Sequence, residues 1–253
     1  MLHERDARLS VLCDKLRVRD YVAARVGADY LVPLLWHGTD PALIPFGELP
    51  ARFVIKTNHG CSYNIIIKDK AQADPLKIKL QLGKWLRINY GEDFCLGIEW
   101  AYRNISPAII VEAFIGESDR PPIDYKFYCF AGRVEFLTQH FGRFVKHQTR
   151  SFDRDYGPHV FHYQFEQYAG PCERPKNFEV MVQLAETLAQ EFEFMRVDLY
   201  NVGGRIFFGE LTPYPGGVST KFLPESLDYT LGEKWKKMQD ASLPSTPKVG
   251  GGR

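Results

Sequence analysis

Two acids and a hydroxyl lie close together in the last quarter of the sequence, at Asp198, Glu210 and Thr212. The stretches that carry them, residues 195–201 and 205–211, are rich in apolar and β-branched side chains and predict a hairpin. Carboxylate and hydroxyl oxygens are hard ligands of the kind that Mg²⁺ prefers. The pattern therefore indicates a magnesium site. From the hairpin alone, ordinary solvated or salt-bridged strand residues explain it equally well.

The length of the hairpin loop decides whether these three side chains share a face of the sheet. Side chains alternate between the two faces of a strand, and the numbers 198, 210 and 212 are all even. A loop with an odd number of residues therefore brings Asp198 and Glu210 together. A three-residue loop with a left-handed glycine satisfies this condition, whereas a two-residue turn at Gly203 and Gly204 would separate the two acids.

Basic residues suited to phosphate lie much earlier in the sequence. Lys56 ends an apolar stretch and precedes a polar turn, residues 58–62. Its ammonium group and the backbone N–H groups of the turn could form a concave anion site. The turn holds a single glycine, however, and does not match the phosphate-loop pattern of two glycines, a lysine and a hydroxyl. Lys15 lies on a predicted helix, where a solvated lysine is the commoner role.

Charged residues in the middle of the sequence occupy unusual positions. Glu112 lies within an apolar run, residues 108–115, where an unpaired carboxylate is costly. A lysine or the amine of a ligand must therefore compensate its charge. Asp124, Lys126 and Arg143 lie on or near a predicted hairpin. A structural ion-pair network explains these three about as well as a phosphate clamp does.

The first half of the chain must position Lys15, Lys56 and Glu112. Apolar residues at intervals of three and four predict one amphipathic helix from about residue 9 to Gly27, with Ser10 as a candidate cap. The proline-rich residues 33–50 predict little regular structure. Further along, the pattern predicts strands over residues 53–57, 64–68 and 108–114, a helix over residues 76–90, and a short helix near residues 99–102.

The second half must position the acids. A hairpin is predicted over residues 125–130 and 133–140, joined at Ala131 and Gly132. Residues 143–176 predict mostly loop. Asn177 can cap a following amphipathic helix, which precedes the hairpin that carries Asp198.

Composition limits the class of protein. The 253 residues are 45% hydrophobic and 25% charged, which is typical of a globular protein and excludes a disordered or fibrous one. Because 32 Lys and Arg balance 31 Asp and Glu, net charge gives no attraction to nucleic acid or anionic lipid. No apolar run is long enough to span a membrane, and the five scattered cysteines indicate reduced thiols. We therefore expect a cytoplasmic protein with no nucleic-acid partner and no membrane insertion.

Several of these weak signals occur in one order that resembles the ATP-grasp superfamily, and most closely its TupA-like branch, which is associated with teichuronopeptide and other surface polysaccharide biosynthesis. The resemblance covers most of residues 13–235. Its carriers are Asp14-Lys15-Leu-Arg-Val-Arg-Asp-Tyr21, Phe53-Val-Ile-Lys56-Thr-Asn-His-Gly60, Glu99-Trp-Ala-Tyr102, Ile110-Val-Glu112, Asp124-Tyr-Lys126-Phe, Phe152-Asp-Arg-Asp155, Arg196-Val-Asp198 and Gly209-Glu-Leu-Thr-Pro-Tyr-Pro-Gly216.

The resemblance implies an α+β ATP-grasp fold, in which two α+β subdomains clasp ATP, with a truncated N-terminal region. It divides the chain into an N-terminal helix with the segment that follows it (residues 1–50), a lid subdomain (51–116), a C-terminal subdomain (117–241) and a disordered tail (242–253). Because the region before Lys15 is short, the acceptor pocket is expected to come from the remaining chain or from a partner.

The resemblance also implies roles for single residues, with ATP and Mg²⁺ as cofactors. Lys15 and Lys56 match lysines that reach the nucleotide phosphates, and Glu112 matches the acid that meets the adenine amino group. The other implied contacts are backbone groups of Ala113 and Ile115 to the base, Asp124 to the ribose, Lys126 and Arg143 to phosphate, and Asp198, Glu210 and Thr212 to the metal. Thr212 stands where many relatives have asparagine, a better metal ligand.

The implied activity is that of an ATP-dependent carboxylate–amine ligase that works through an acyl phosphate. Its partners would be an amine or amino acid and a uronic-acid-type carboxylate of a surface polysaccharide or its precursor. Two alternatives remain open: a phosphotransferase that acts on a sugar hydroxyl, and an ATP-binding protein without catalysis. The sequence also leaves the oligomeric state open, a homodimer included.

Overall fold

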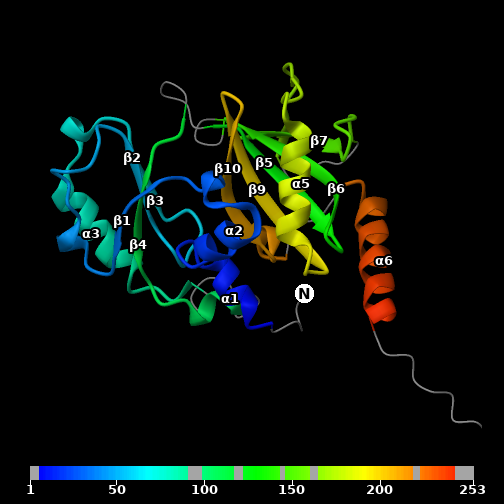
Figure 1. The fold of residues 1–253 in the computed structure, drawn as a ribbon, viewed down its shortest axis with the longest axis horizontal. Coiled ribbons are helices and arrows are strands. Elements are labelled where there is room, and N and C mark those ends of the chain that lie inside the picture. Colours follow the sequence, from blue (N-terminus) through cyan, green and yellow to red (C-terminus); the bar gives the residue numbers. More distant parts are fainter. Residues whose placement is uncertain are drawn as a thin grey trace, which may run out of the picture.

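The computed structural model describes residues 6–90, 99–116, 122–142, 146–159, 165–218 and 223–242. These residues form an α+β fold with two β-sheets that lie side by side (Figure 1). The smaller sheet has the strand order β1-β4-β2-β3, and the larger has the order β10-β9-β5-β6-β7-β8. The predicted fold class is confirmed.

The smaller sheet consists of β1 (Leu34–Gly38), β2 (Phe53–Thr57), β3 (Asn64–Ile67) and β4 (Ile109–Ala113), and all its pairs are antiparallel. Helix α3 (Pro75–Trp85) covers one face and packs Ile78 and Leu82 against Phe53 and Ile55. Lys56 and Glu112 belong to the other face, because their paired positions alternate with these buried residues.

The structure corrects two predictions in this half. The proline-rich segment contains β1, which fits between Pro33 and Pro41 and pairs with β4. The predicted helix over residues 76–90 spans Pro75–Trp85, and Leu76 and Leu80 face solvent instead of the sheet.

The larger sheet consists of β5 (Asp124–Phe130), β6 (Arg133–Phe141), β7 (Gln148–Asp153), β8 (Glu166–Gln167), β9 (Phe194–Val202) and β10 (Arg205–Thr212). Helix α5 (Phe178–Ala189) lies across one face and buries the main apolar core there (Figure 1). Helix α6 (Glu225–Ser242) contacts the opposite face near Tyr128 and Phe136. Strands β7 and β8 fall where mostly loop was expected.

Two side chains near these elements act differently from the prediction. Asn177 does not cap α5. Its amide donates to the Gly204 carbonyl at 2.7 Å, and its side-chain oxygen accepts from Asn201 at 2.7 Å. Ser10 lies inside α1 (Arg8–Cys13), so it is not a cap either. Short 3₁₀ helices connect the other elements, at Ala28–Tyr30, Pro41–Leu43, Lys70–Gln72, Trp100–Asn104 and Pro215–Val218.

The predicted first helix is in fact two helices, α1 and α2 (Val18–Val26), separated at Asp14. The Asp14 carboxylate accepts the N–H groups of Leu16 and Arg17 at 2.8 and 3.2 Å, in the turn that separates α1 from α2. The same oxygen accepts from the Asn58 amide at 3.0 Å. The break therefore ties the N-terminal helices to the turn that follows β2.

Asn58 is 1% exposed, and its side chain bonds Asp14, Ser106 and Ala108. Its amide nitrogen also donates to the Ser106 carbonyl at 3.0 Å, and its oxygen accepts the Ala108 N–H at 2.7 Å. We predict that Asn58→Ala lowers the unfolding free energy by about 2–4 kcal/mol, because it leaves buried polar partners unpaired.

Urea denaturation measures this loss. The control is Asn64→Ala in β3, where the side chain is exposed and a change of less than about 0.5 kcal/mol is expected. Equal, small effects of the two substitutions would show that the Asn58 contacts contribute nothing to stability.

Candidate active site

Asp198 and Glu210 share a face of the larger sheet, although the loop between their strands is not the expected one. The loop is a two-residue turn, Gly203 and Gly204, with φ angles of 58° and 84°. By itself this turn would place the two acids on opposite faces. A register shift at Gly209, between Phe208 and Glu210, adds one residue to β10 and pairs Glu210 directly with Asp198.

The backbone at Gly209 explains why the extra residue is a glycine. A Cβ atom there would lie 3.0 Å from the Asp198 carbonyl oxygen and 3.1 Å from the Tyr200 ring. Both contacts are tighter than ordinary van der Waals distances. The β-bulge at Gly209 therefore brings the two carboxylates together. Any larger residue at this position would force the neighbouring atoms to move.

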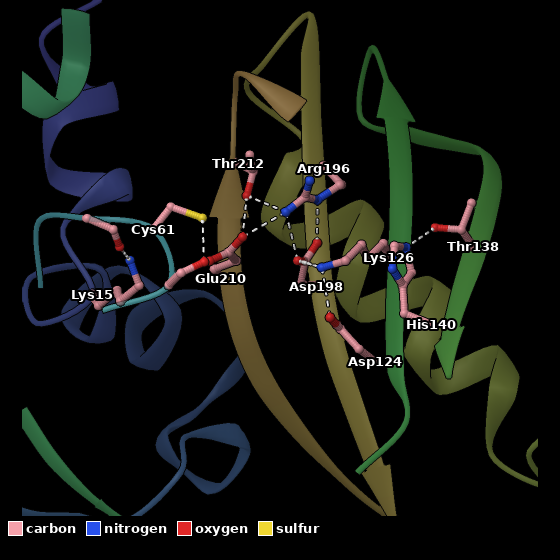
Figure 2. Close-up of polar contacts among 12 residues, drawn as sticks. Lys15, Cys61, Asp124, Lys126, Thr138, His140, Arg196, Asp198, Glu210 and Thr212 are labelled. Atoms are coloured by element: carbon pink, nitrogen blue, oxygen red, sulfur yellow. Dashed lines mark hydrogen bonds and ion pairs between the residues drawn. The ribbon is translucent and has the colours of Figure 1, made fainter. Parts of the chain in front are cut away.

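Arg196 lies at the centre of the predicted metal ligands. One of its terminal nitrogens, Nη2, is 2.9 Å from Asp198 Oδ2, 2.7 Å from Glu210 Oε1 and 2.9 Å from Thr212 Oγ1 (Figure 2). Arg196, Asp198 and Thr212 are buried, whereas the Glu210 side chain is 37% exposed. Burial acts to lower the pKa of the Arg196 guanidinium, but the carboxylates of Asp198 and Glu210 hold it well above its usual value.

The donor set fits a hard divalent cation. Three oxygens from Asp198, Glu210 and Thr212 converge on a single positively charged nitrogen of Arg196. Mg²⁺–oxygen distances are about 2.0–2.1 Å, so the guanidinium would have to withdraw and the oxygens move inward. Within the described parts of the chain, no three His, Cys, Asp or Glu side chains gather as a metal site. Thr212 or water would therefore complete the coordination.

Lys126 continues the charged cluster onto β5. Its ammonium nitrogen is 2.8 Å from Asp124 Oδ2 and also bonds the Asp198 carboxylate, which lies directly opposite on β9. All three side chains are buried. With Arg196 and Glu210 included, the cluster holds three carboxylates against two cations. The excess negative charge favours an added cation.

Lys15 supports the turn after β2. Its ammonium group donates to the Gly60 carbonyl at 2.7 Å, and its backbone N–H donates to the Asn58 carbonyl. Figure 2 shows this turn, with Cys61 at its tip, next to Glu210 of β10. Burial raises the pKa of Tyr102, and the nearby Glu210 and Cys61 add to that shift, which agrees with this placement. The structure thus brings Lys15 and the turn to the acid cluster.

Glu112 has protein partners for both of its carboxylate oxygens. Lys56 Nζ lies 2.6 Å from Oε2, and Arg19 Nη1 lies 3.0 Å from Oε1. Of the two expected partners for Glu112, a lysine or a ligand amine, the structure shows the lysine. Lys56 pairs with the buried acid, and Arg19 does so as well. The Ala113 N–H donates to the Pro33 carbonyl at 3.0 Å.

Two of the predicted residues add little to this picture. Ile115 is partly exposed just beyond β4. Arg143 lies outside the described residues.

The sequence did not single out His140, which lies on β6 opposite Asp124. Its Nε2 is 3.0 Å from Thr138 Oγ1, and its Nδ1 is 2.8 Å from His147 Nε2. Burial, assisted by the charge of Lys126, lowers the pKa of His140 to about 2. The imidazole is therefore neutral at physiological pH. The sequence signal for His140 is the alternation of side chains along β6, which places residues 138 and 140 on the same face of the sheet.

Comparison with solved structures shows the fold. The fold matches D-alanine–D-alanine ligase from Bacillus anthracis with a TM-score of 0.50 and 17% identity over 92% of this chain and 66% of that one. It matches the Coxiella burnetii enzyme of the same name with a TM-score of 0.50 and 12% identity over 92% and 60% of the two chains. The chain thus spans about two thirds of these relatives or less. Its fold is the ATP-grasp fold.

The family is defined more narrowly. The model of the TupA-like ATP-grasp family matches residues 1–236, and the chain belongs to that family. No curated protein sequence matches it. In the described part of the chain, every helix is too short or too polar to cross a membrane.

The low pKa of His140 predicts a pH effect on stability. The folded value lies below the unfolded value of about 6.5, so the stabilisation is complete above pH 6.5 and is lost as the pH falls. Between pH 7.5 and 5, His140 should account for a loss of about 2 kcal/mol. His140→Gln removes the titrating group and should flatten the decline by that amount.

Urea denaturation of both proteins at a series of pH values measures the two slopes. Their difference isolates His140 from other groups, including His59, whose pKa burial also lowers. Parallel slopes would show that His140 does not have to stay neutral in the folded protein.

Proposed function

We propose that this protein is an ATP-dependent carboxylate–amine ligase that acts through an acyl phosphate. One observation carries the proposal: the oxygens of Asp198, Glu210 and Thr212 converge on one cationic nitrogen, beside Lys126 and the turn held by Lys15. Membership of an ATP-grasp family supports the nucleotide. The fold shared with D-alanine–D-alanine ligases supports amide-bond formation.

The nucleotide would lie between the two sheets. Lys15 and Lys56 would contact its phosphates, and Glu112 would accept the adenine amino group through lone pairs that Arg19 and Lys56 leave available. The Ala113 N–H is already bonded to Pro33, so the base would use the Ala113 carbonyl and the backbone of Ile115. Asp124 would face the ribose, and Lys126 with Arg143 would face phosphate.

The reaction needs two displacements. An oxygen of the acceptor carboxylate attacks the γ-phosphorus and releases ADP, and an amine then attacks the acyl carbon and releases phosphate. The ammonium groups of Lys15, Lys56 and Lys126 offset the charge that gathers on the moving phosphoryl group. Asp198, Glu210 and Thr212 would hold Mg²⁺, which would supply further positive charge to the phosphates. No serine or cysteine nucleophile is required.

We infer the substrates from the family. The acceptor would be a uronic-acid-type carboxylate in surface polysaccharide biosynthesis, and the nucleophile an amino acid or another amine. Such a reaction consumes ATP and so belongs in the cytoplasm.

Product analysis tests the reaction class. ADP and inorganic phosphate that appear only when both an acid and an amine are present support ligation. A stable phosphate ester on the acceptor would contradict the ligase and support a phosphotransferase. If the protein binds Mg-ATP but releases no ADP with any of a broad panel of acids and amines, the result would support a non-catalytic ATP-binding protein.

Glu210→Gln tests the metal ligands. The side chain keeps its size and is partly exposed, so the fold should survive, while Mg²⁺-dependent ADP release should fall by about 10²–10³-fold. A coupled ADP assay over a range of Mg²⁺ concentrations measures the loss. Glu179→Gln on α5, where the side chain is 70% exposed, is the matched control and should leave turnover unchanged. Turnover retained in Glu210→Gln would contradict the metal assignment.

Lys56→Ala tests the lid lysine. Lys56→Ala should weaken ATP by about 10-fold or more and weaken it more than adenosine, because only ATP carries phosphates, while any loss of adenosine affinity reflects the broken ion pair with Glu112. Calorimetric titration with each ligand measures both. Lys77→Ala on α3, with an 84% exposed side chain, serves as the control. Equal losses for ATP and adenosine would count against a contact between Lys56 and the phosphates.

A further inference from the structure

Helix α3 exposes apolar side chains on the side that faces away from its sheet. Leu76 and Leu80, one helical turn apart, are 69% and 61% exposed. Ile78 and Leu82 follow them at intervals of two residues and are buried against the smaller sheet. A helix with one buried face normally presents polar residues to solvent. Two leucines at the centre of the outer face therefore indicate that a partner covers it.

A neighbouring segment adds a third leucine. The 3₁₀ helix Pro41–Leu43 lies against α3, because Lys79 Nζ donates to the Ala42 carbonyl at 3.1 Å. Leu43 is 69% exposed. In the part of the chain that the structure describes, Leu43, Leu76 and Leu80 are the three most exposed leucines, and we call them the leucine surface. This surface lies at the opposite end of the molecule from α6 (Figure 1).

Basic side chains accompany the leucine surface. Residues 68–87, which include α3, contain six Lys and Arg against two Asp, for a net charge of +4. The whole chain has a net charge of +1, so the remaining residues carry −3. On α3, Lys84 lies one turn beyond Leu80, and Lys77 follows Leu76 and pairs with Asp74 at 3.3 Å. The balanced total charge thus hides a positive end that coincides with the exposed leucines.

This combination favours a bilayer with anionic lipids over other partners. A net charge of +4 attracts an anionic surface and repels a second copy of the same surface. The leucines project from the outer side of a helix, and a fluid bilayer can take up such side chains without a matching groove. Lysines suit this setting, since their apolar stems lie beside buried leucines while their ammonium groups reach the lipid phosphates.

We propose that the leucine surface docks this protein on an anionic membrane. Leu43, Leu76 and Leu80 enter the boundary between headgroups and acyl chains, and Lys77 and Lys84 bind lipid phosphates. The contact is peripheral, and no segment crosses the bilayer. Docking leaves the candidate active site accessible, because α3 covers the face of the smaller sheet opposite the face of its two charged residues, at positions 56 and 112. The inference does not depend on the proposed reaction.

Cosedimentation with lipid vesicles tests the docking surface. Vesicles of phosphatidylcholine with about one third phosphatidylglycerol should bind at least about 20-fold more tightly than vesicles of phosphatidylcholine alone, because each lysine near an anionic surface contributes about fivefold. An increase in salt from about 0.1 M to about 0.5 M should weaken the binding by about 10-fold, because salt screens the lysines.

A leucine variant measures the apolar contact. Leu76→Gln combined with Leu80→Gln keeps a good helix former at each position and should weaken binding to the anionic vesicles by about 20-fold or more. Tyr229→Gln on α6 removes another largely exposed apolar side chain and should change binding by less than about twofold. An unchanged melting temperature shows that each variant keeps its fold.

A lysine variant measures the electrostatic contact. Lys77→Gln combined with Lys84→Gln should weaken binding to the anionic vesicles by about 20-fold and leave binding to phosphatidylcholine unchanged. Lys146→Gln near the larger sheet is the control, since its side chain is also exposed and pairs with Glu166, and it should have little effect.

Three outcomes would overturn the proposal. One is a failure to bind anionic vesicles, and another is equal binding by the leucine variant and the parent protein. The third is a dimer that the leucine variant dissociates, or capture of a polyglutamate peptide, without vesicle binding; the surface would then belong to a second copy or to an acidic protein segment. ATP turnover with soluble acids and amines is measured without vesicles. Turnover without vesicle binding removes the membrane contact but not the ligase, and vesicle binding without turnover does the reverse.

Discussion

The burial of charge on one face of the larger sheet is the constraint on which the rest of the structure depends. Asp124 and Asp198 are buried against Lys126 and Arg196 with little water to screen them, and the partly exposed Glu210 also bonds Arg196. In such a setting each charge needs its partners, because removing one leaves another buried and uncompensated. The apolar opposite face, packed on α5, stabilises the sheet that holds the cluster together. Stability and site chemistry are thus divided between two faces of the same strands.

Two local backbone features position this cluster and the turn that follows β2. The bulge at Gly209 places Glu210 opposite Asp198, and at the break between α1 and α2 the Asp14 carboxylate accepts from both Leu16 and Asn58. Lys15 follows that break directly and bonds the turn at Gly60. The bulge and the break therefore place the turn after β2 near Glu210, although the two are more than a hundred residues apart in the sequence (Figure 2).

The sequence predicted the strands that carry runs of buried apolar side chains and missed those that do not. β2, β4, β5 and β9 each bury apolar side chains in a readable pattern, whereas β1 lies among prolines and β7 in a polar stretch, and both exist mainly because a neighbouring strand pairs with them. The apolar period of the first helix runs through Asp14, so the break could not be seen without Asn58. For a similar reason, the alternation of side chains with a two-residue turn did not predict that Asp198 and Glu210 share a face. The register shift at Gly209, which brings them together, depends on contacts across the strands.

The types of the site residues were predictable, but their partners were not. An acid in an apolar strand signals compensation, yet only the fold shows that Arg19 and Lys56 supply it to Glu112. Arg196 has the larger consequence. Its guanidinium leaves the cluster with one excess negative charge, and exchange for a divalent cation would bring three carboxylates, Lys126 and the ion to neutrality. The displaced guanidinium would then need a new anion, and on the proposed function the triphosphate provides one. The two exchanges balance each other, so the charges of this face favour arrival of the ion together with the nucleotide over arrival of the ion alone.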